Sequence, residues 1–212
     1  VTGAGRGFCA GADVKDLFQA QADSGEVRQG SSESGNWVDL VRRSKPIVAA
    51  VNGAAIGVGL TQILPMDYIM AGSGAKLSCR FIKMGLVPEL ASSHFLVARC
   101  GLGLASELML SGKTVVAEEA QRIGLVDQVV PGEQLLSAAI AVARSMGENP
   151  QVALQMVKEL ITQNMTEKDL LEVQRRESKA LTECYKSMEH KEAIAAFLEK
   201  RAPDFVKART ND

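Results

Sequence analysis

The 212-residue chain is poor in the residues that build several common kinds of functional site. It has two histidines, His94 and His190, too few for a histidine-rich metal site. Its four cysteines are scattered and form no CxxC pair, so they give no zinc-binding spacing and suit a reducing compartment. Aromatic residues make up 4% of the chain, which argues against stacking platforms for nucleic-acid bases.

Charge and hydropathy exclude two further classes of partner. The formal net charge is −1 and no basic block stands out, so we expect no nucleic-acid partner. No apolar run is long enough to cross a bilayer, so we expect no membrane partner and a cytoplasmic location. The opening VTGAG resembles the end of a strand entering a loop. We therefore expect the N-terminal part of the domain to be missing, and a targeting signal cannot be judged.

The hydrophobic pattern predicts an α/β protein, with an α/β core over residues 1–130 and a helical region over residues 131–212. Hydrophobic residues make up 46% of the chain, enough for a sizeable core. Short apolar runs predict buried strands at 47–51, 68–71, 76–79 and 125–130. Apolar spacing and capping residues predict helices at 13–22, 37–43, 57–64, 118–122, 133–146, 150–164, 167–185 and 189–199, and a helix from residue 92 broken at Gly101 and Gly103. Residues 23–35 are predicted to form a loop.

Two stretches of small residues are the most informative part of the sequence. They are FCAGAD at Phe8–Asp13 and VNGAAIGVGL at Val51–Leu60, and each places glycine or alanine where a loop turns into a helix. Such turns leave backbone N–H groups without intrahelical partners, and these groups attract negative charge. Two facing turns could hold an oxygen that becomes anionic during a reaction. The alternative is that the small residues serve only close packing between a strand and a helix.

These motifs resemble the enoyl-CoA hydratase/isomerase (crotonase) superfamily. Further segments agree in order along the chain: Lys45-Pro46, Asp67, the run LSG from Leu110 followed by Glu119-Ala and GLV from Gly124, and FLEKR from Phe197. The resemblance implies a crotonase-like spiral of ββα units with a C-terminal helical region that forms homotrimers or hexamers. It also implies an acyl-CoA substrate, with coenzyme A as part of the thioester and no other cofactor or metal.

The same resemblance assigns the oxyanion donors to the backbone N–H groups of Ala10 and Val58. Valine stands at 58 where the family has the middle glycine of a turn, and the donor persists there if φ stays negative. The residues expected to contact the thioester are Ala10, Gly11, Ala12, Asp13, Gly57 and Val58. Asp67 is expected to support a turn, not to take part in chemistry.

The acidic residues decide which reaction fits. The hydratases of this family use two glutamates, and the aligned positions here hold Thr61 and Phe81. A carboxylate occurs instead at Glu89, in the run LVPELASS from Leu86, which resembles the Δ3,Δ2-enoyl-CoA isomerase branch. Phe81 is expected to line the acyl pocket. Apolar neighbours such as Leu86 and Val87 are expected to desolvate Glu89 and to strengthen it as a base.

We therefore expect an isomerase that converts 3-enoyl-CoA to 2-enoyl-CoA with Glu89 as its acid/base. Glu89 could instead only favour the helix that begins near Ala91. The alternative functions are an enoyl-CoA hydratase and a non-catalytic CoA-binding module. His94, five residues after Glu89, is expected to be a structural or surface histidine.

Overall fold

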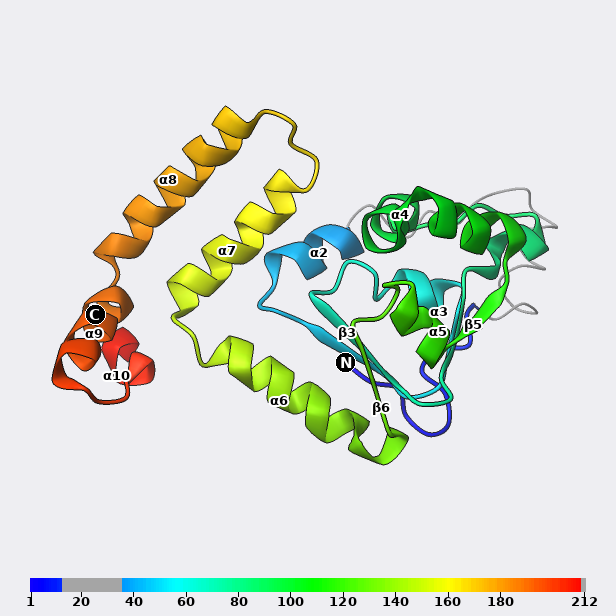
Figure 1. The fold of residues 1–212 in the computed structure, drawn as a ribbon, viewed down its shortest axis with the longest axis horizontal. Helices are drawn as coiled ribbons and strands as arrows, with labels where there is room; N and C mark the ends of the chain where they lie inside the picture. Colours follow the sequence, from blue (N-terminus) through cyan, green and yellow to red (C-terminus); the bar gives the residue numbers. More distant parts are fainter. Residues whose placement is uncertain (13–35, 211–212) are drawn as a thin grey trace. The chain divides into compact units, whose positions relative to one another are not determined.

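The computed structural model of the protein describes residues 1–12 and 36–210. The helix expected over residues 13–22 and the loop expected over 23–35 lie outside these residues. Short strands and helices alternate in the first part of the chain, and the last part is helical (Figure 1). The elements are α2 (Trp37–Arg43), β1 (Val48–Val51), β2 (Ala54–Ile56), α3 (Val58–Thr61), β3 (Tyr68–Gly72), β4 (Lys76–Ser78), the 3-10 helix η2 (Arg80–Met84), α4 (Ser92–Ser111), β5 (Thr114–Val116), α5 (Ala117–Arg122), β6 (Gln128–Val130), the 3-10 helix η3 (Gly132–Gln134), α6 (Leu135–Gly147), α7 (Gln151–Asn164), α8 (Leu170–Lys186), α9 (Met188–Glu199) and α10 (Phe205–Thr210).

The strands form two small sheets. One has the order β1-β3-β6, all parallel, and the other has the order β2-β4-β5, with β2 and β4 parallel and β5 antiparallel. Isolated parallel bridges pair Thr2 with Ala50 and Cys9 with Ala55, so the start of the chain lies beside β1 and then beside β2. Residues 2–9 therefore run from the β1-β3-β6 sheet to the β2-β4-β5 sheet, beside the chain that connects β1 to β2.

Two aspartates fix the register of the β1-β3-β6 sheet in the same way. Asp67 lies directly before β3; its N–H donates to the Ile47 carbonyl (3.0 Å), and its Oδ2 accepts from the Ile47 N–H (2.7 Å). Asp127 lies directly before β6 and makes the same pair of bonds with Ile69 (2.8 and 2.7 Å). Each carboxylate thus closes the start of one strand onto its neighbour, which agrees with the structural role expected for Asp67.

The structure corrects several predicted elements. Strands β2 and β5 fall in stretches where the sequence predicted no strand, and α3 is four residues long instead of extending over 57–64. Strand β6 begins at Gln128, three residues later than predicted. Gly101 does interrupt α4 with a non-helical conformation (φ 75°, ψ 164°), whereas Gly103 lies within the helix. Residue 103 is exposed, and a Cβ added there would meet no atom within 4 Å, so the helix passes through it without constraint.

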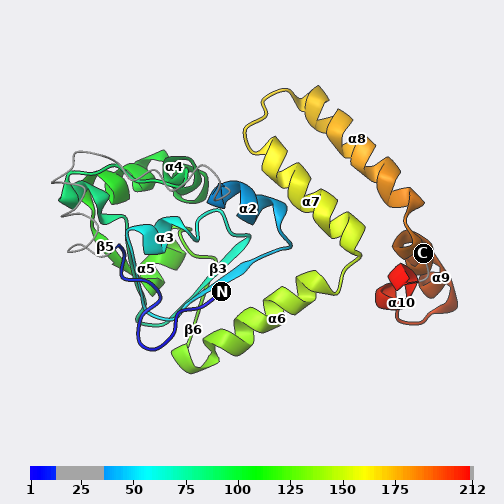
Figure 2. The same cartoon turned by 180° about the vertical axis from the view of Figure 1, so that it is seen from behind.

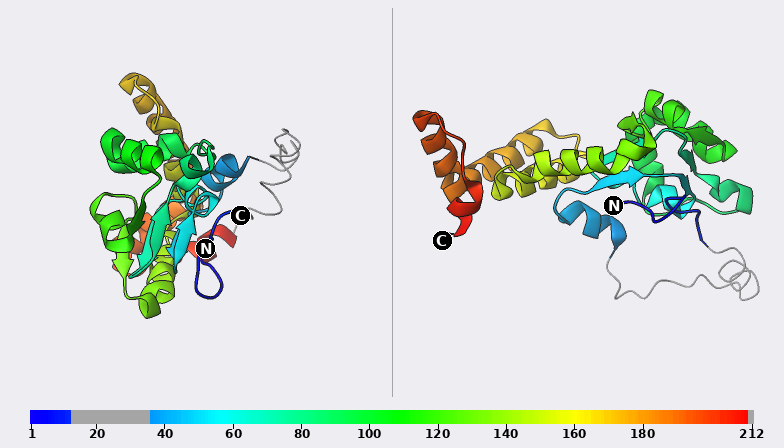
Figure 3. Two further views of the ribbon diagram at one scale, coloured as in Figure 1. Left: turned by 90° about the vertical axis from the view of Figure 1, so that its right-hand side faces the viewer. Right: turned by 90° about the horizontal axis from the view of Figure 1, so that it is seen from below.

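Contacts divide the chain into two compact units. The strand unit consists of Val1–Val41 and Ile47–Ala141, and the helical unit consists of Arg42–Pro46 and Val142–Asp212. Figure 2 shows α3, α4 and α5 grouped with the strands of the first unit. In the helical unit α7 and α8 run side by side, and α9 packs against α10 (Figures 1 and 3). The sequence predicted a different division, between a core over residues 1–130 and a helical oligomerisation region over residues 131–212. That division stays a prediction.

The core of the strand unit is built from aliphatic side chains. Strand β1 is buried along its whole length, and Leu60, Ile63 and Leu64 from the α3 region are at most 1% exposed. Ile69 and Leu77 from β3 and β4 are fully buried beside them, as is Leu96 of α4. Burying such side chains contributes about 1.5–3 kcal/mol each, so this cluster stabilises the strand unit. No helix among the described residues is long and apolar enough to cross a membrane.

Candidate active site

Two of the predicted site residues, Ala10 and Val58, follow neighbouring strand segments at one edge of the β2-β4-β5 sheet. Ala10 follows Cys9, which pairs in parallel with Ala55 of β2. Val58 follows β2 itself, separated from it only by Gly57. Strand β4 runs parallel to β2 and continues into η2 and then toward Glu89. Carboxyl ends of parallel strands are where ligands bind in open α/β sheets, so this edge is the place where the predicted groups can meet.

The two small-residue turns are packed against one another. A Cβ atom added to Gly59 would lie 2.2 Å from the Cys9 carbonyl oxygen and 2.9 Å from the Cys9 Cβ. A Cβ atom added to Gly11 (φ 106°) would lie 3.2 Å from the Ile56 carbonyl oxygen. Ala10 lies between Cys9 and Gly11 in the chain, so its turn is held against the first turn of α3. The packing alternative and the oxyanion hypothesis both require this contact, and the structure brings the two turns together.

The backbone N–H groups of Ala10 and Val58 differ from their neighbours in hydrogen bonding. Neighbouring groups are used: Cys9 N–H donates to Ala54 O (2.9 Å) and Gly57 N–H donates to Ser78 O (2.9 Å). Among the described residues, no hydrogen bond is recorded for the N–H of either Ala10 or Val58. Val58 is the first residue of α3 and does not have a positive φ, so valine leaves its N–H in place where the family has glycine.

Gly57, directly before α3, has a backbone conformation that favours glycine. Its φ of 58° and ψ of −121° lie in a region that side-chain-bearing residues rarely adopt. Ala10 is exposed, and Gly11, Ala12 and Gly57 are half-buried. Asp13 lies outside the described residues.

Neither Thr61 nor Phe81, which the family resemblance aligns with the hydratase glutamates, is an acid or a base. Thr61 is fully buried, and its hydroxyl lies 3.5 Å from the Val58 carbonyl oxygen. Phe81 is half-buried in η2 and packs against the hydrophobic core. Neither side chain can activate water or deliver a proton as a carboxyl group would.

Glu89 lies between η2 and α4 in a segment without regular secondary structure, and its side chain is exposed. The expectation that Leu86 and Val87 desolvate it is wrong for the single chain, because these side chains are 40% and 82% exposed. The next two residues, Leu90 (φ 56°) and Ala91 (φ 54°), both adopt the left-handed conformation. Each costs about 1–2 kcal/mol for a residue with a Cβ, so the backbone beside Glu89 is strained. Such strain is typical of functional sites.

Other reactive side chains nearby are less suited to chemistry. His94 is exposed and makes an edge contact with the Phe95 ring (5.4 Å between centroids), as expected of a surface histidine. Burial raises the pKa of the Cys79 thiol to about 11, so it stays protonated and unreactive at neutral pH. Ser92, at the start of α4, is buried, and its hydroxyl has no partner among the described residues.

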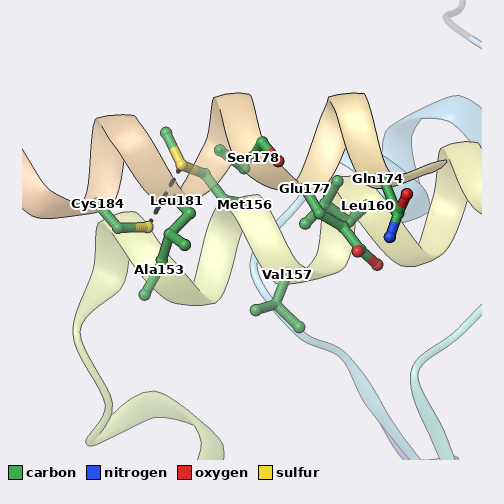
Figure 4. A pocket seen from close by; sticks show the side chains of 10 residues that line it. Ala153, Met156, Val157, Leu160, Gln174, Glu177, Ser178, Leu181 and Cys184 are labelled. Carbon is green, nitrogen blue, oxygen red and sulfur yellow. Dashed lines mark hydrogen bonds between the residues drawn. The ribbon is translucent and has the colours of Figure 1, made fainter. Parts of the chain in front are cut away.

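A groove of about 730 Å³ lies elsewhere, between α7 and α8 of the helical unit (Figure 4). Its lining is mainly apolar, including Met156, Val157, Leu160 and Leu181, and the Cys184 Sγ lies 3.6 Å from the Met156 Sδ. It contains none of the predicted site residues. In the described part of the chain, no group of three or more His, Cys, Asp or Glu side chains could hold a metal ion.

Sequence reasoning missed the hydrogen bonds of one residue beside the first turn. Asn52 was noticed only as part of a family motif, yet its side-chain amide binds the backbone at Gly3, Gly5 and Gly7, in the segment that leads to Ala10. The signal in the sequence is an asparagine placed directly after a buried strand and before glycine.

Comparison with known proteins gives a consistent result. The family model described as "Enoyl-CoA hydratase/isomerase" matches residues 1–208. The 2,3-dehydroadipyl-CoA hydratase of Escherichia coli is 34% identical over 205 residues, which cover 97% of this chain and 79% of that protein. The 1,2-epoxyphenylacetyl-CoA isomerase of the same organism is 35% identical over 213 residues, with the same coverage. The crystal structure of an enoyl-CoA hydratase from Bacillus anthracis has a TM-score of 0.85 and 31% identity, and the match covers 96% of this chain and 79% of that one. The structural likeness confirms the crotonase-like fold.

Proposed function

Because the chain belongs to the enoyl-CoA hydratase/isomerase family, we propose that it moves a carbon–carbon double bond in an enoyl-CoA thioester, from 3-enoyl-CoA to 2-enoyl-CoA. The observation that supports this proposal is that the segments after Cys9, after β2 and after β4 leave the same edge of the β2-β4-β5 sheet. Ala10 and Val58 lie in the first two segments, and Glu89 follows β4 through η2. Two of these supply backbone donors, and the third supplies a carboxylate.

In the proposed reaction, the Glu89 carboxylate removes a proton from C2 of the 3-enoyl thioester. The electron pair moves onto the thioester oxygen, which accepts hydrogen bonds from the Ala10 and Val58 N–H groups as a dienolate. Glu89 then returns the proton to C4, and the double bond lies between C2 and C3. No water is consumed, so a single acid/base suffices.

The composition of the site favours isomerisation over hydration. Thr61 and Phe81 occupy the places of the two hydratase glutamates, and the strained turn at Leu90 and Ala91 sets the backbone beside Glu89. Hydratase activity is the second candidate, because several relatives bear that name, among them the short-chain-enoyl-CoA hydratase of Clostridium acetobutylicum. The names of the relatives alone do not separate the two, since isomerase-named and hydratase-named proteins are similar to this chain to the same degree.

Glu89→Gln tests the proposal. The substitution keeps the size of the side chain and removes its basicity, so we expect loss of 3-enoyl-CoA isomerisation by about 10²–10⁴-fold, with acyl-CoA binding retained. Glu118→Gln is a matched control, because Glu118 is an exposed glutamate in the first turn of α5 and has no proposed role. Full activity in Glu89→Gln, or efficient water addition to 2-enoyl-CoA by the wild type, would overturn the proposed mechanism.

We also propose that the protein assembles into homotrimers or hexamers through its C-terminal helices. Several apolar side chains on these helices are exposed in the single chain, including Leu170, Leu171 and Phe197 at 74%, 76% and 82%. Light scattering at micromolar concentration tests this, and a monomer would contradict it.

A further inference from the structure

We infer that Asn52 is a positioning residue that holds the Ala10 N–H where the thioester oxygen needs it. This rests on the proposed function, because it assigns to Ala10 the role of an oxyanion donor. Asn52 itself does not belong to the donor pair, and it acts through the loop over residues 3–7.

Three hydrogen bonds join the Asn52 amide to this loop. Its Oδ1 accepts from the Gly3 N–H (3.0 Å), and its Nδ2 donates to Gly5 O (3.0 Å) and Gly7 O (3.3 Å). One partner is a donor and the other two are acceptors, so only one orientation of the amide satisfies all three. An asparagine side chain supplies one acceptor oxygen and two donor hydrogens. The oxygen and both hydrogens bind the backbone of the loop.

Two glycines bring the loop into close backbone contact beside Asn52. A Cβ atom added to Gly53 would lie 2.2 Å from the Arg6 carbonyl oxygen, and one added to Gly3 would lie 2.3 Å from the Gly7 carbonyl oxygen. The backbone of Arg6 and Gly7 thus packs directly on Gly53, and Gly3 packs on the backbone of Gly7. Close packing and the amide together define where the loop ends at Gly7.

Because the segment from Gly7 to Ala10 is short, a shift of Gly7 would also shift Ala10. The Gly7 carbonyl is held by Asn52, and the next two N–H groups, of Phe8 and Cys9, both donate to Ala54 O (3.1 and 2.9 Å). Ala10 follows directly. If Asn52 releases Gly7, the bonds that Phe8 and Cys9 make with β2 remain, but the residues before them lose the anchor that the amide provides. A shift of about 1 Å at a catalytic group can lower the rate by about 10²-fold.

Asn52→Asp is the informative variant. Aspartate has the same shape, but its carboxylate offers only acceptors, so the two carbonyls of Gly5 and Gly7 would face oxygen instead of N–H. Asn149→Asp is the matched control, because the Asn149 amide also donates to two backbone carbonyls, Ser145 O (2.8 Å) and Met146 O (3.1 Å), at the end of α6. Asn52→Ala, which introduces no charge, is measured beside them.

The readout is the carbonyl stretching frequency of bound hexanoyl-CoA labelled with ¹³C at the thioester carbonyl, measured with the purified full chain. Hydrogen bonds from the donor pair lower this frequency, and a saturated thioester needs no proton transfer. We expect a smaller shift in Asn52→Asp than in the wild type and a kcat for 3-enoyl-CoA reduced about 10²-fold, with little change in KM. Asn149→Asp should match the wild type in both.

An unchanged carbonyl frequency and kcat in a folded Asn52→Asp or Asn52→Ala protein would overturn the positioning role. Loss of folding in both variants would overturn it as well, because Asn52 would then be required for the fold itself. Absence of a frequency shift in the wild type would show that Ala10 and Val58 do not donate to the thioester oxygen. The positioning role of Asn52 would then also be wrong. A wild-type shift that persists in Glu89→Gln keeps the test valid even if isomerisation by Glu89 fails.

Discussion

Gly59 offers the most direct test of whether the two turns must touch for catalysis. In Gly59→Ala the new Cβ would lie 2.2 Å from the Cys9 carbonyl oxygen, whereas real Cβ atoms essentially never approach another heavy atom closer than 3.0 Å. The α3 turn and the Cys9 segment must therefore separate by about 0.8 Å, or more for an ordinary contact. The contacting atoms belong to the backbone and to a Cβ, so no flexible side chain can absorb the change.

The expected effect on rate follows from this displacement. A misplacement of about 1 Å at a catalytic group lowers the rate by about 10²-fold, which corresponds to about 2.7 kcal/mol. Loss of one oxyanion donor in other enzymes costs about 2.7–4 kcal/mol, the same range. We expect Gly59→Ala to reduce kcat for 3-enoyl-CoA isomerisation by about 10²-fold or more. Overpacking should also lower the free energy of unfolding by about 1–3 kcal/mol.

The assay compares Gly59→Ala with Gly103→Ala by kinetics and by urea unfolding. Gly103 is exposed within α4, and a Cβ added there meets nothing within 4 Å, so alanine should leave kcat unchanged and stabilise the helix by about 0.5–1 kcal/mol. A folded Gly59→Ala protein with the kcat of the wild type would refute the reasoning. The contact between the turns would then serve packing alone.

Three further predictions concern stability. In Asp67→Ala the Ile47 N–H loses its carboxylate acceptor, so urea unfolding should show a loss of about 1–3 kcal/mol with unchanged kcat, and a fall in kcat without this loss would contradict a structural role. In Ser92→Ala a buried hydroxyl without a partner among the described residues is removed, so the free energy of unfolding should rise by about 1 kcal/mol, and a fall would show that the hydroxyl is satisfied in solution. The Arg201 guanidinium lowers the pKa of Glu192 to about 2, so the stabilisation from this exposed pair is present above the ordinary carboxyl pKa and is lost as the pH falls toward 2. The difference in Tm between wild type and Glu192→Gln should therefore shrink from pH 6 to pH 2, and a constant difference would argue against the pair.

The sequence predicted secondary structure best where the hydrophobic pattern of a single segment is enough to identify the element. The run IVAAV over residues 47–51 indicates a buried strand, and β1 lies within it. Strand β2, Ala54–Ile56, was not predicted because its small residues are equally typical of a loop leading to a helix. Its identity as a strand comes from partners distant in the chain, Cys9 and β4.

The candidate site shows the same division. The small residues around Ala10 and Val58 indicated two turns, and the structure packs these turns together. The left-handed conformations of Leu90 and Ala91 could not be predicted, because neither residue is glycine and local preference opposes both. The bonds of Asn52 could not be predicted either, since its partners lie between 45 and 49 residues away.

The paired aspartates before β3 and β6 have a consequence for how the sheet comes apart. Each one ties a strand only to its immediate neighbour, Asp67 to Ile47 and Asp127 to Ile69. A sheet joined in this stepwise way resembles a stack of repeats in which stability is summed over adjacent interfaces. Fraying should therefore begin at an outer strand and stop at the next intact aspartate, and amide hydrogen exchange should be faster along the outer strand β6 than along the central strand β3.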